Sequence, residues 1–316
     1  MERTATGIDT VQFFSRTAVG LLALVLVAGC ATTVHRTTTD HEGVALHVVA
    51  AENFWGSIAT QLGGSKVAVE SIITNPDTDP HDYDPSAADA RYISGAAVVI
   101  ENGIGYDPWV SKLLAANGAG PAQRVVNVGD VVGVADGGNP HRWYNPTDVH
   151  TVIAAITAAY AAANPADAAY FASQQKDFET NGLAQYTNLI NQIKTTYAGT
   201  PVAASESIFA MMVPALGLNL LTPPTFLRAI SEGTDPTSAD KTTIDNQLKT
   251  HAIKVYVYNS QNATPDVHAQ IDEAKEAGIA IVAITETLSP ATATFQAWQV
   301  AQLTALESAL AKATGR

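Results

Sequence analysis

Short runs of β-branched and other apolar residues alternate with longer alanine-rich stretches along most of the chain. The apolar runs predict strands, and most of the stretches between them predict helices. The predicted strands are Leu46–Ala50, Val67–Ile73, Ala96–Ile100, Arg124–Val128, Val202–Ser205, Asn219–Leu221, Lys254–Tyr258 and Ile279–Ile284. Strands that alternate with helices in this way are typical of parallel sheets covered by helices, so the pattern predicts an α/β fold.

The alternation stops after Pro146, where nearly continuous helix is predicted over Thr147–Asn164 and Ala166–Tyr197. Pro165 lies between the two helices, at a position where a proline readily starts a helix. The second helix would be about 48 Å long at about 1.5 Å per residue. Gly182 weakens the helical pattern near its middle. We therefore expect two lobes, each with a mostly parallel sheet flanked by helices, joined by one long helix.

This pattern divides the chain into five predicted segments. A signal peptide is expected over residues 1–29 and a flexible tether over residues 30–43. An amino-terminal lobe over 44–165 and a carboxyl-terminal lobe over 199–316 would be joined by a linking helix over 166–198.

The amino terminus carries Arg3 and Arg16, followed by an apolar run of about 11 residues that ends at Ala28. A membrane span needs about 20 apolar residues, so the shorter run is typical of a signal peptide. The run leads into Val27-Ala28-Gly29-Cys30, which resembles the lipobox of bacterial lipoproteins. The resemblance implies that Cys30 is lipidated, becomes the first residue of the mature protein and anchors it to the outer face of the cytoplasmic membrane.

Composition narrows the chemistry that the protein can perform. The 316 residues are 47% hydrophobic and 15% charged, which is enough apolar material for about two domains. The 17 basic and 30 acidic residues give a net charge of −13, which disfavours nucleic acid as a partner and favours cations. Since the chain has a single cysteine, it can form neither an internal disulfide nor a thiolate cluster. A metal would need nitrogen and oxygen ligands.

Two histidines occur in stiff loops that follow predicted strands. Ligands of open α/β sheets bind beyond the carboxyl ends of the strands, so these loops are the places to search. His81 lies in Thr78–Pro85 and His141 lies in Asn139–Pro146. Each histidine directly follows a proline, which restricts the loop and lowers the entropy lost on binding. Both are therefore candidate metal ligands.

Two glutamates occupy equivalent places in the second half of the chain. Glu206 follows the predicted strand Val202–Ser205, and Glu286 follows Ile279–Ile284. A charge at such a position is costly unless it is paired. A divalent ion held by two carboxylates is formally neutral, which lowers the cost of burying it between two lobes.

The motifs DPHDYDP (79–85), NPHRWYNP (139–146), ASES (204–207) and ITETLSP (284–290) occur together with the lipobox and the long joining helix. In this combination, from about Val44 to the end, the chain resembles the zinc and manganese solute-binding lipoproteins of bacterial ABC importers. The resemblance implies one divalent transition metal held between two α/β lobes and handed to a membrane permease driven by a cytoplasmic ATPase.

The resemblance also assigns the ligands residue by residue. His81 and His141 match the two histidines of the family's amino-terminal lobe. Glu206 falls where zinc-type members often have histidine and manganese-type members have glutamate. Glu286 falls where many members have aspartate, so its extra methylene changes the geometry of the fourth ligand.

The donor set suits Zn²⁺, Mn²⁺ or Fe²⁺, whereas Cu(I) prefers thiolate and thioether ligands. Carboxylates that bind through one oxygen would give a four-coordinate, zinc-like site. Carboxylates that bind through both of their oxygens would raise the coordination number towards six, which suits manganese. Glu206 and the lack of histidine in Asn127–Asn139 favour manganese, and the general affinity order favours zinc. Both metals remain candidates as the transported ligand.

Two other classes of function are alternatives to metal capture for import. A secreted metallohydrolase would need an open coordination position and a general base, and the sequence contains neither HExxH nor GxSxG, so we do not expect an enzyme. A lipoprotein of the same architecture could instead bind a metal chelate or act mainly as an adhesin, but paired Pro-His loops argue against a bulky ligand. We expect a monomer. The remaining histidines are expected to be surface or capping residues: His35, His41, His47, His150, His251 and His268.

Overall fold

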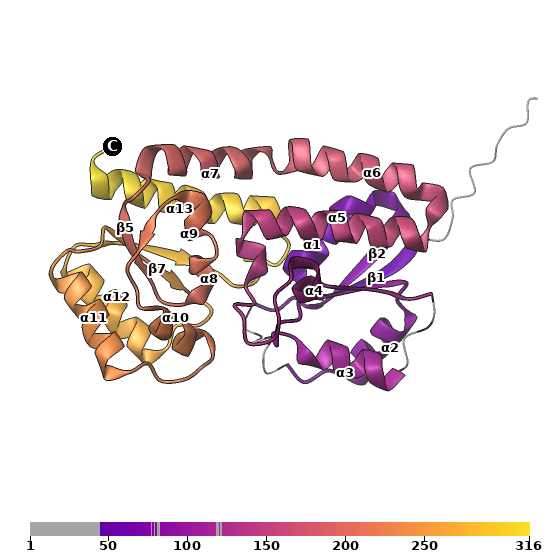
Figure 1. The fold of residues 1–316 in the computed structure, drawn as a ribbon, viewed down its shortest axis with the longest axis horizontal. Helices are drawn as coiled ribbons and strands as arrows, with labels where there is room; N and C mark the ends of the chain where they lie inside the picture. The colour runs from indigo at the N-terminus through magenta and orange to yellow at the C-terminus, as the bar shows by residue number, and fades with distance from the viewer. Residues whose placement is uncertain (1–44, 77, 79, 81–82, 118–119, 121) are drawn as a thin grey trace, which may run out of the picture. The chain divides into compact units, whose positions relative to one another are not determined.

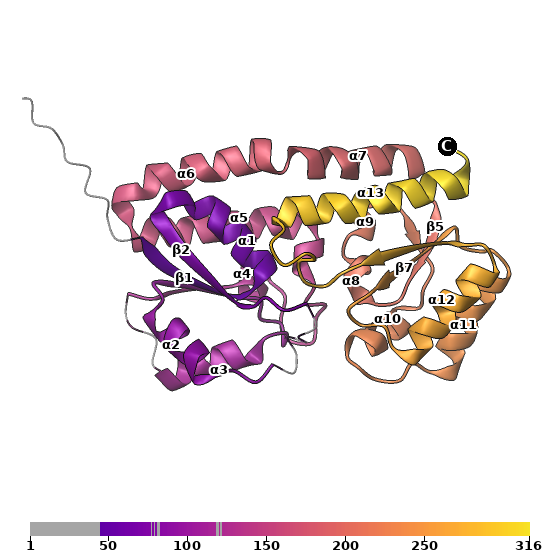
Figure 2. The same ribbon diagram turned by 180° about the vertical axis from the view of Figure 1, so that it is seen from behind.

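The computed structural model describes residues 45–76, 78, 80, 83–117, 120 and 122–316. These residues belong to one compact unit that contains two four-stranded parallel sheets (Figures 1 and 2). The predicted lipidation site Cys30 and the predicted ligand His81 lie outside the described residues.

The first sheet has the strand order β2-β1-β3-β4, and every neighbouring pair is parallel. Its elements are β1 (Leu46–Glu52), α1 (Asn53–Gly63), β2 (Val67–Ile73), α2 (Ala87–Gly95), β3 (Val98–Glu101), α3 (Pro108–Asn117), β4 (Arg124–Asn127), α4 (Val128–Val132) and α5 (Pro146–Ala163). All four predicted strands of this lobe are present.

Successive residues of β1 pack on opposite faces of the first sheet, as the alternation of side chains along a strand requires. Val48 and Ala50 join a core that includes residues of α1 and α5. Val49 and Ala51 join a separate core with residues of α2 and α3. A sheet covered on both faces needs continuous apolar strands, which explains why its central strands are apolar runs without polar alternation.

The second sheet repeats this plan with the strand order β6-β5-β7-β8. Its elements are β5 (Pro201–Ala204), α8 (Ser207–Ala210), α9 (Val213–Leu216), β6 (Asn219–Leu220), α10 (Pro224–Ser231), α11 (Ser238–Lys249), β7 (Val255–Asn259), α12 (Pro265–Glu276), β8 (Ala280–Ile284) and α13 (Phe295–Thr314). Val255 and Val257 pack in the same core as α13 and α7 (Ala184–Tyr197), whereas Tyr256 packs with α10, α11 and α12 on the other face.

The connection between the lobes is helical but not one regular helix. A 3-10 turn at Pro165–Asp167 leads into α6 (Ala168–Asp177), a π-helical turn at Phe178–Gly182 and α7 (Ala184–Tyr197). The α6 and α7 helices run along one side of the molecule, and α13 lies beside α7 (Figures 1 and 2). One apolar core contains residues of both sheets and of these helices, so the lobes share a packed interior.

The segment between β5 and β6 forms two short helices, α8 and α9, instead of one continuous helix. Pro214 lies at the start of α9. In one continuous helix its ring would clash with the carbonyl group of Ala210, four residues earlier, so the helix is interrupted.

Candidate metal centre

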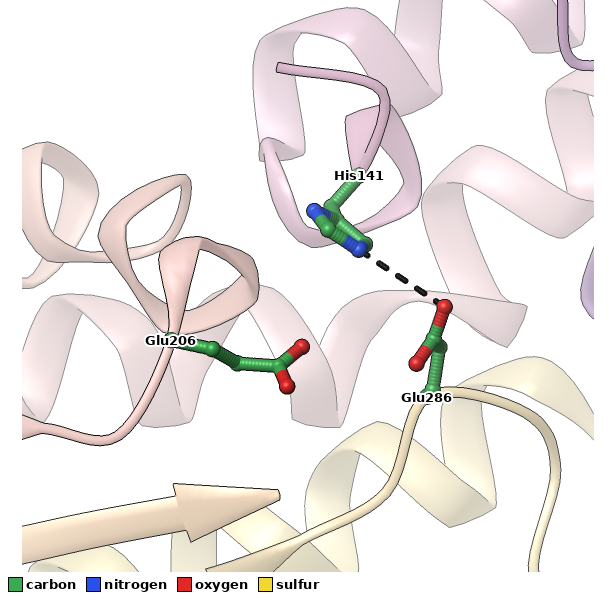
Figure 3. A group of neighbouring side chains, drawn as sticks. All are labelled: His141, Glu206 and Glu286. Atoms are coloured by element: carbon green, nitrogen blue, oxygen red, sulfur yellow. Dashed lines mark ion pairs between the residues drawn. The ribbon is translucent and has the colours of Figure 1, made fainter. Parts of the chain in front are cut away.

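Three of the four predicted ligands converge in the structure. His141, Glu206 and Glu286 each offer one ligand atom, and these atoms all lie within 4.8 Å of one another (Figure 3). The histidine comes from the loop before α5 in the first lobe, and the glutamates come from strand ends of the second. The site is therefore assembled from both lobes.

Neighbouring groups orient the imidazole of His141, which is buried. Asn139 donates through Nδ2 to the Ser207 carbonyl at 2.8 Å, so its Oδ1 must be the atom that faces His141. That oxygen lies 2.9 Å from His141 Nδ1 and also accepts from the His141 backbone N–H. Nδ1 therefore carries the proton and Nε2 presents a lone pair, which is the arrangement that a metal ligand needs.

Glu206 lies two residues beyond β5, in extended backbone just before α8. Its side chain is buried, and a buried carboxylate is costly unless donors surround it. Asn259 donates to its Oε1 at 3.2 Å and Asn262 donates to its Oε2 at 2.9 Å. These donors are uncharged, so they hold the carboxylate without neutralising it.

Glu286 lies two residues beyond β8 and faces His141. Its Oε1 is 3.6 Å from His141 Nε2 and accepts a hydrogen bond of 2.7 Å from the Tyr106 hydroxyl. Its Oε2 accepts from Asn259 at 3.1 Å, and its backbone N–H donates to the Gln261 side chain at 2.7 Å. Glu286 is thus held by residues from both lobes.

Two aromatic residues after His141 connect the lobes beneath the site. Trp143 Nε1 donates to the Glu286 carbonyl at 3.0 Å, and the Tyr144 hydroxyl donates to the Thr285 carbonyl at 2.6 Å. Burial, together with the charge of Glu286, raises the pKa of Tyr144 above its ordinary value, so its hydroxyl stays protonated as a donor. The histidine loop and the Glu286 loop are therefore joined through backbone carbonyls.

A tight loop after β3 places Tyr106 beside the site. The backbone is left-handed at Gly103, Ile104 and Gly105, and the Asp107 carboxylate accepts from the N–H groups of Asn102 and Gly103, both at 2.7 Å. Asp107 thus ties the two ends of the loop together. Burial raises its pKa to about 7.

Glu52 lies at the end of β1, is fully buried and neighbours the carboxyl group of Asp107. Burial first, and then the charge of Asp107, raises the pKa of Glu52 well above its ordinary value. Asp107 accepts two backbone N–H donors and is the better site for the negative charge. Glu52 is therefore the protonated member of the pair.

Several positioning residues were not predicted from the sequence. These residues are Tyr106, Asn259, Gln261 and Asn262. A signal was present, because residues 259–262 (NSQN) form an amide-rich loop directly after a strand.

The described histidines outside the motifs do not join the group of three. His150, His251 and His268 are exposed, and His47 is partly buried. His150 pairs with Glu179 at 3.6 Å on the helical side of the first lobe. His35 and His41 lie outside the described residues.

The chemistry of the site fits a divalent transition metal. It combines an imidazole lone pair with two carboxylates, which are borderline and hard donors. The donors that hold these carboxylates are amides and a phenol, which carry no charge. An arrangement of this kind attracts a cation and offers it nitrogen and oxygen ligands.

Comparison with known proteins identifies the family. The model of the ZnuA family, described as zinc-uptake complex component A, periplasmic, matches residues 48–309. The chain belongs to this family. The predicted resemblance to metal solute-binding proteins of ABC importers is thereby confirmed at the level of the family.

Curated relatives of the ZnuA-family chain carry manganese and zinc names. The manganese ABC transporter substrate-binding lipoprotein PsaA of Streptococcus pneumoniae is 26% identical over 267 residues, which are 78% of this chain and 81% of that protein. The high-affinity zinc uptake system protein ZnuA of Bacillus subtilis is 21% identical over 255 residues, 74% and 77% of the two chains. The manganese-binding lipoprotein MntA of Halalkalibacterium halodurans is 25% identical over 138 residues, and the match spans 45% of its length.

Solved structures confirm the predicted fold. A manganese-bound periplasmic metal-binding protein from Candidatus Liberibacter asiaticus aligns with a TM-score of 0.69 and 18% identity over 83% of this chain and 98% of that one. A crystal structure of ZnuA aligns with a TM-score of 0.67 over 85% and 99% of the two chains. Two α/β lobes with parallel sheets are thus the architecture of this ZnuA-family member. Among the described residues, no helix has the length and apolar character that crossing a membrane requires.

Proposed function

We propose that this ZnuA-family protein captures a divalent transition metal outside the cytoplasmic membrane and delivers it to an ABC importer. The observation that carries the proposal is the convergence of His141, Glu206 and Glu286 from two lobes onto one point. The metal is cargo, and no catalytic step is assigned to the chain. The manganese and zinc names of the relatives support this class of cargo.

The proposed ligand set is His81, His141, Glu206 and Glu286. Three of these ligand atoms lie within 4.8 Å of one another, close to the spacing of ligands around one small ion. His81 is included as the fourth ligand on the evidence of the sequence alone. Like His141, it directly follows a proline in a loop after a predicted strand. Mn²⁺ and Zn²⁺ are the candidate cargoes, and Fe²⁺ is compatible with the same donors.

The proposal includes a cellular setting. The lipobox-like sequence before Cys30 supports lipid anchoring at the outer face of the cytoplasmic membrane. The chain would act as a monomer whose partners are a membrane permease and its ATPase. Residues 44–165 and 199–316 would form the two metal-binding lobes, with 166–198 as the linking helix.

Competitive metal titration tests the proposal. The full chain, purified in mild detergent and stripped of metal, is offered Mn²⁺, Zn²⁺ and Fe²⁺ together and analysed by native mass spectrometry. We expect one ion per chain, and no stoichiometric ion in His81→Ala or His141→Ala. A wild-type chain that binds none of these ions at stoichiometry would refute the proposed function.

A further inference from the structure

Asn102 directly follows β3 and is fully buried. Its backbone N–H donates to Asp107 Oδ2 at 2.7 Å, and its backbone carbonyl accepts from the Gly129 N–H at 3.0 Å. Its side chain is held as well, because the Trp55 indole N–H donates to Asn102 Oδ1 at 3.1 Å. A buried residue that is bonded at these three groups has little freedom to turn.

The amide nitrogen of Asn102 connects this residue to the histidine loop. An indole nitrogen can only donate, so Oδ1 is the atom that faces Trp55 and Nδ2 is the atom that faces Pro140. Nδ2 donates to the Pro140 carbonyl at 3.0 Å. Since Pro140 directly precedes His141, the end of β3 is linked to the loop that carries the proposed ligand.

The peptide group between Pro140 and His141 is bonded on both sides. Its carbonyl accepts from Asn102, and its N–H donates to Asn139 Oδ1 at 3.1 Å. The Arg142 N–H also donates to this carbonyl at 2.6 Å, but Arg142 belongs to the loop and moves with it. A peptide group is planar, so fixing its carbonyl and its N–H fixes the direction in which the Cα of His141 projects.

The position of this peptide decides where the His141 ring lies. Asn139 Oδ1 lies 2.9 Å from His141 Nδ1 as well as accepting from the His141 backbone N–H. The ring can keep this partner only while the peptide stays in place. Asn139 is bonded to the Ser207 carbonyl of the second lobe, whereas Asn102 links the same peptide to the first sheet. The His141 ring is thereby positioned from both lobes.

We propose that Asn102 is a positioning residue that directs the His141 imidazole at the metal by holding the Pro140 carbonyl. The inference rests on the proposed function, in which His141 Nε2 binds the ion. Asn102 acts through the backbone of the loop and does not bind the ion itself. A ring that already points at the site loses less conformational freedom when the ion binds, so Asn102 contributes to affinity.

Nitrogen NMR of the metal-free full chain with labelled histidine tests the position of the ring. The His141 signals are those that disappear in His141→Ala. In the wild type we expect only the Nδ1–H tautomer, since Asn139 Oδ1 selects it. Asn102→Ala and Asn102→Asp both lack the donor to Pro140, and in both we expect the Nε2–H tautomer to appear as well.

Metal affinity is measured on the same variants by isothermal titration with Zn²⁺ and with Mn²⁺. Both affinities should fall by about tenfold, the lower end of the usual loss when a group that orients a histidine ligand is removed. Asn102→Asp keeps the acceptor for the Trp55 indole and nearly the same volume, so it isolates the loss of the donor. Unchanged affinities, or an affinity loss with the wild-type tautomer retained, would overturn the inference.

Ser111→Ala is the matched control. Ser111 donates to Glu101 Oε2 at 2.7 Å, at the residue directly before Asn102, rather than to the histidine loop. Losing this bond should lower the stability of the protein, leave the His141 tautomer unchanged and keep both affinities within about twofold. Changes in Ser111→Ala as large as those in the Asn102 variants would assign the effect to the whole strand end and contradict the role of Asn102.

The wild type alone decides the inference if the Asn102 variants do not fold. A metal-free wild type that shows both tautomers of His141 would refute it, because the ring would then not be held. A wild type that binds neither Zn²⁺ nor Mn²⁺ refutes the proposed function. A wild type that binds metal, with the same single tautomer in both Asn102 variants, refutes only the role of Asn102.

Discussion

Tyr106 and Glu286 lie 180 residues apart in the chain and are joined by a hydrogen bond of 2.7 Å. The tyrosine belongs to the first lobe and the glutamate to the second, so the bond crosses between them. The oxygen that accepts it is the one that faces His141. The phenol therefore orients the oxygen that we expect to bind the metal.

Replacing Tyr106 with Phe should weaken metal binding by about tenfold, because a hydrogen bond to a charged group is worth about 1.5–3 kcal/mol. The loss should appear mainly as faster dissociation in stopped-flow competition with a chelator. Tyr92→Phe is the control, since Tyr92 is an exposed tyrosine of the same lobe. Tighter binding in Tyr106→Phe would show that the bond competes with the metal instead of supporting it.

His141→Ala should reduce affinity by at least about a hundredfold, because it removes a ligand and leaves two carboxylates without their nitrogen partner. His150→Ala should change it little, since that side chain is exposed and pairs with Glu179. Isothermal titration with the preferred metal measures both. Equal losses in the two variants would remove His141 from the site.

Asn139→Ala should lower affinity by about tenfold to a hundredfold, the usual cost of losing a group that orients a histidine ligand. The expected mechanism is loss of the Nδ1–H tautomer, which Asn139 Oδ1 selects at 2.9 Å. Nitrogen NMR of labelled imidazole reports the tautomer directly. Asn191→Ala, at an exposed position of α7, serves as control. A wild-type His141 protonated at Nε2 would be incompatible with this account.

Glu52→Gln should stabilise the fold at alkaline pH. The folded-state pKa of Glu52 is raised, and that of Asp107 is raised to about 7, so the folded protein binds more protons than the unfolded chain between about pH 4 and 7. Stability is therefore full below that window and falls as the pH rises through it. Removing one acid should raise the free energy of unfolding at pH 8 by about 1–2 kcal/mol and change it less at pH 5.

Guanidinium unfolding at the two pH values measures this difference. Glu70→Gln, at an exposed position of β2, should leave both values nearly unchanged. A wild-type protein whose stability rises between pH 5 and pH 8, with no gain in Glu52→Gln, would contradict the protonated state assigned to Glu52.

Local patterns predicted most of the fold. The bounds of β2 agree with the predicted Val67–Ile73, because a short segment rich in β-branched residues is typical of a strand. The loops that carry His141, Glu206 and Glu286 were predicted because parallel sheets collect their carboxyl ends at one edge. His81 stays a prediction.

The positioning residues could not be derived in the same way. Asn259 bridges two glutamates only because β7 lies between β5 and β8, and chain order does not reveal strand order. The bond from Tyr106 to Glu286 depends on how the two lobes pack. The π-helical turn at Phe178–Gly182 is a local irregularity that the apolar pattern of a long helix does not show.

The two sheets have the same strand order relative to the chain, so β3 in the first corresponds to β7 in the second. Both strands end in a polar residue, Glu101 and Asn259. Glu101 accepts hydrogen bonds from Ser111 and Asn127 of its own lobe, whereas Asn259 reaches the ligands. One architectural plan thus occurs twice with different outcomes. The first sheet encloses the acidic side chains at its strand ends within its own lobe, whereas the acids that follow the strands of the second sheet converge with His141 of the other lobe.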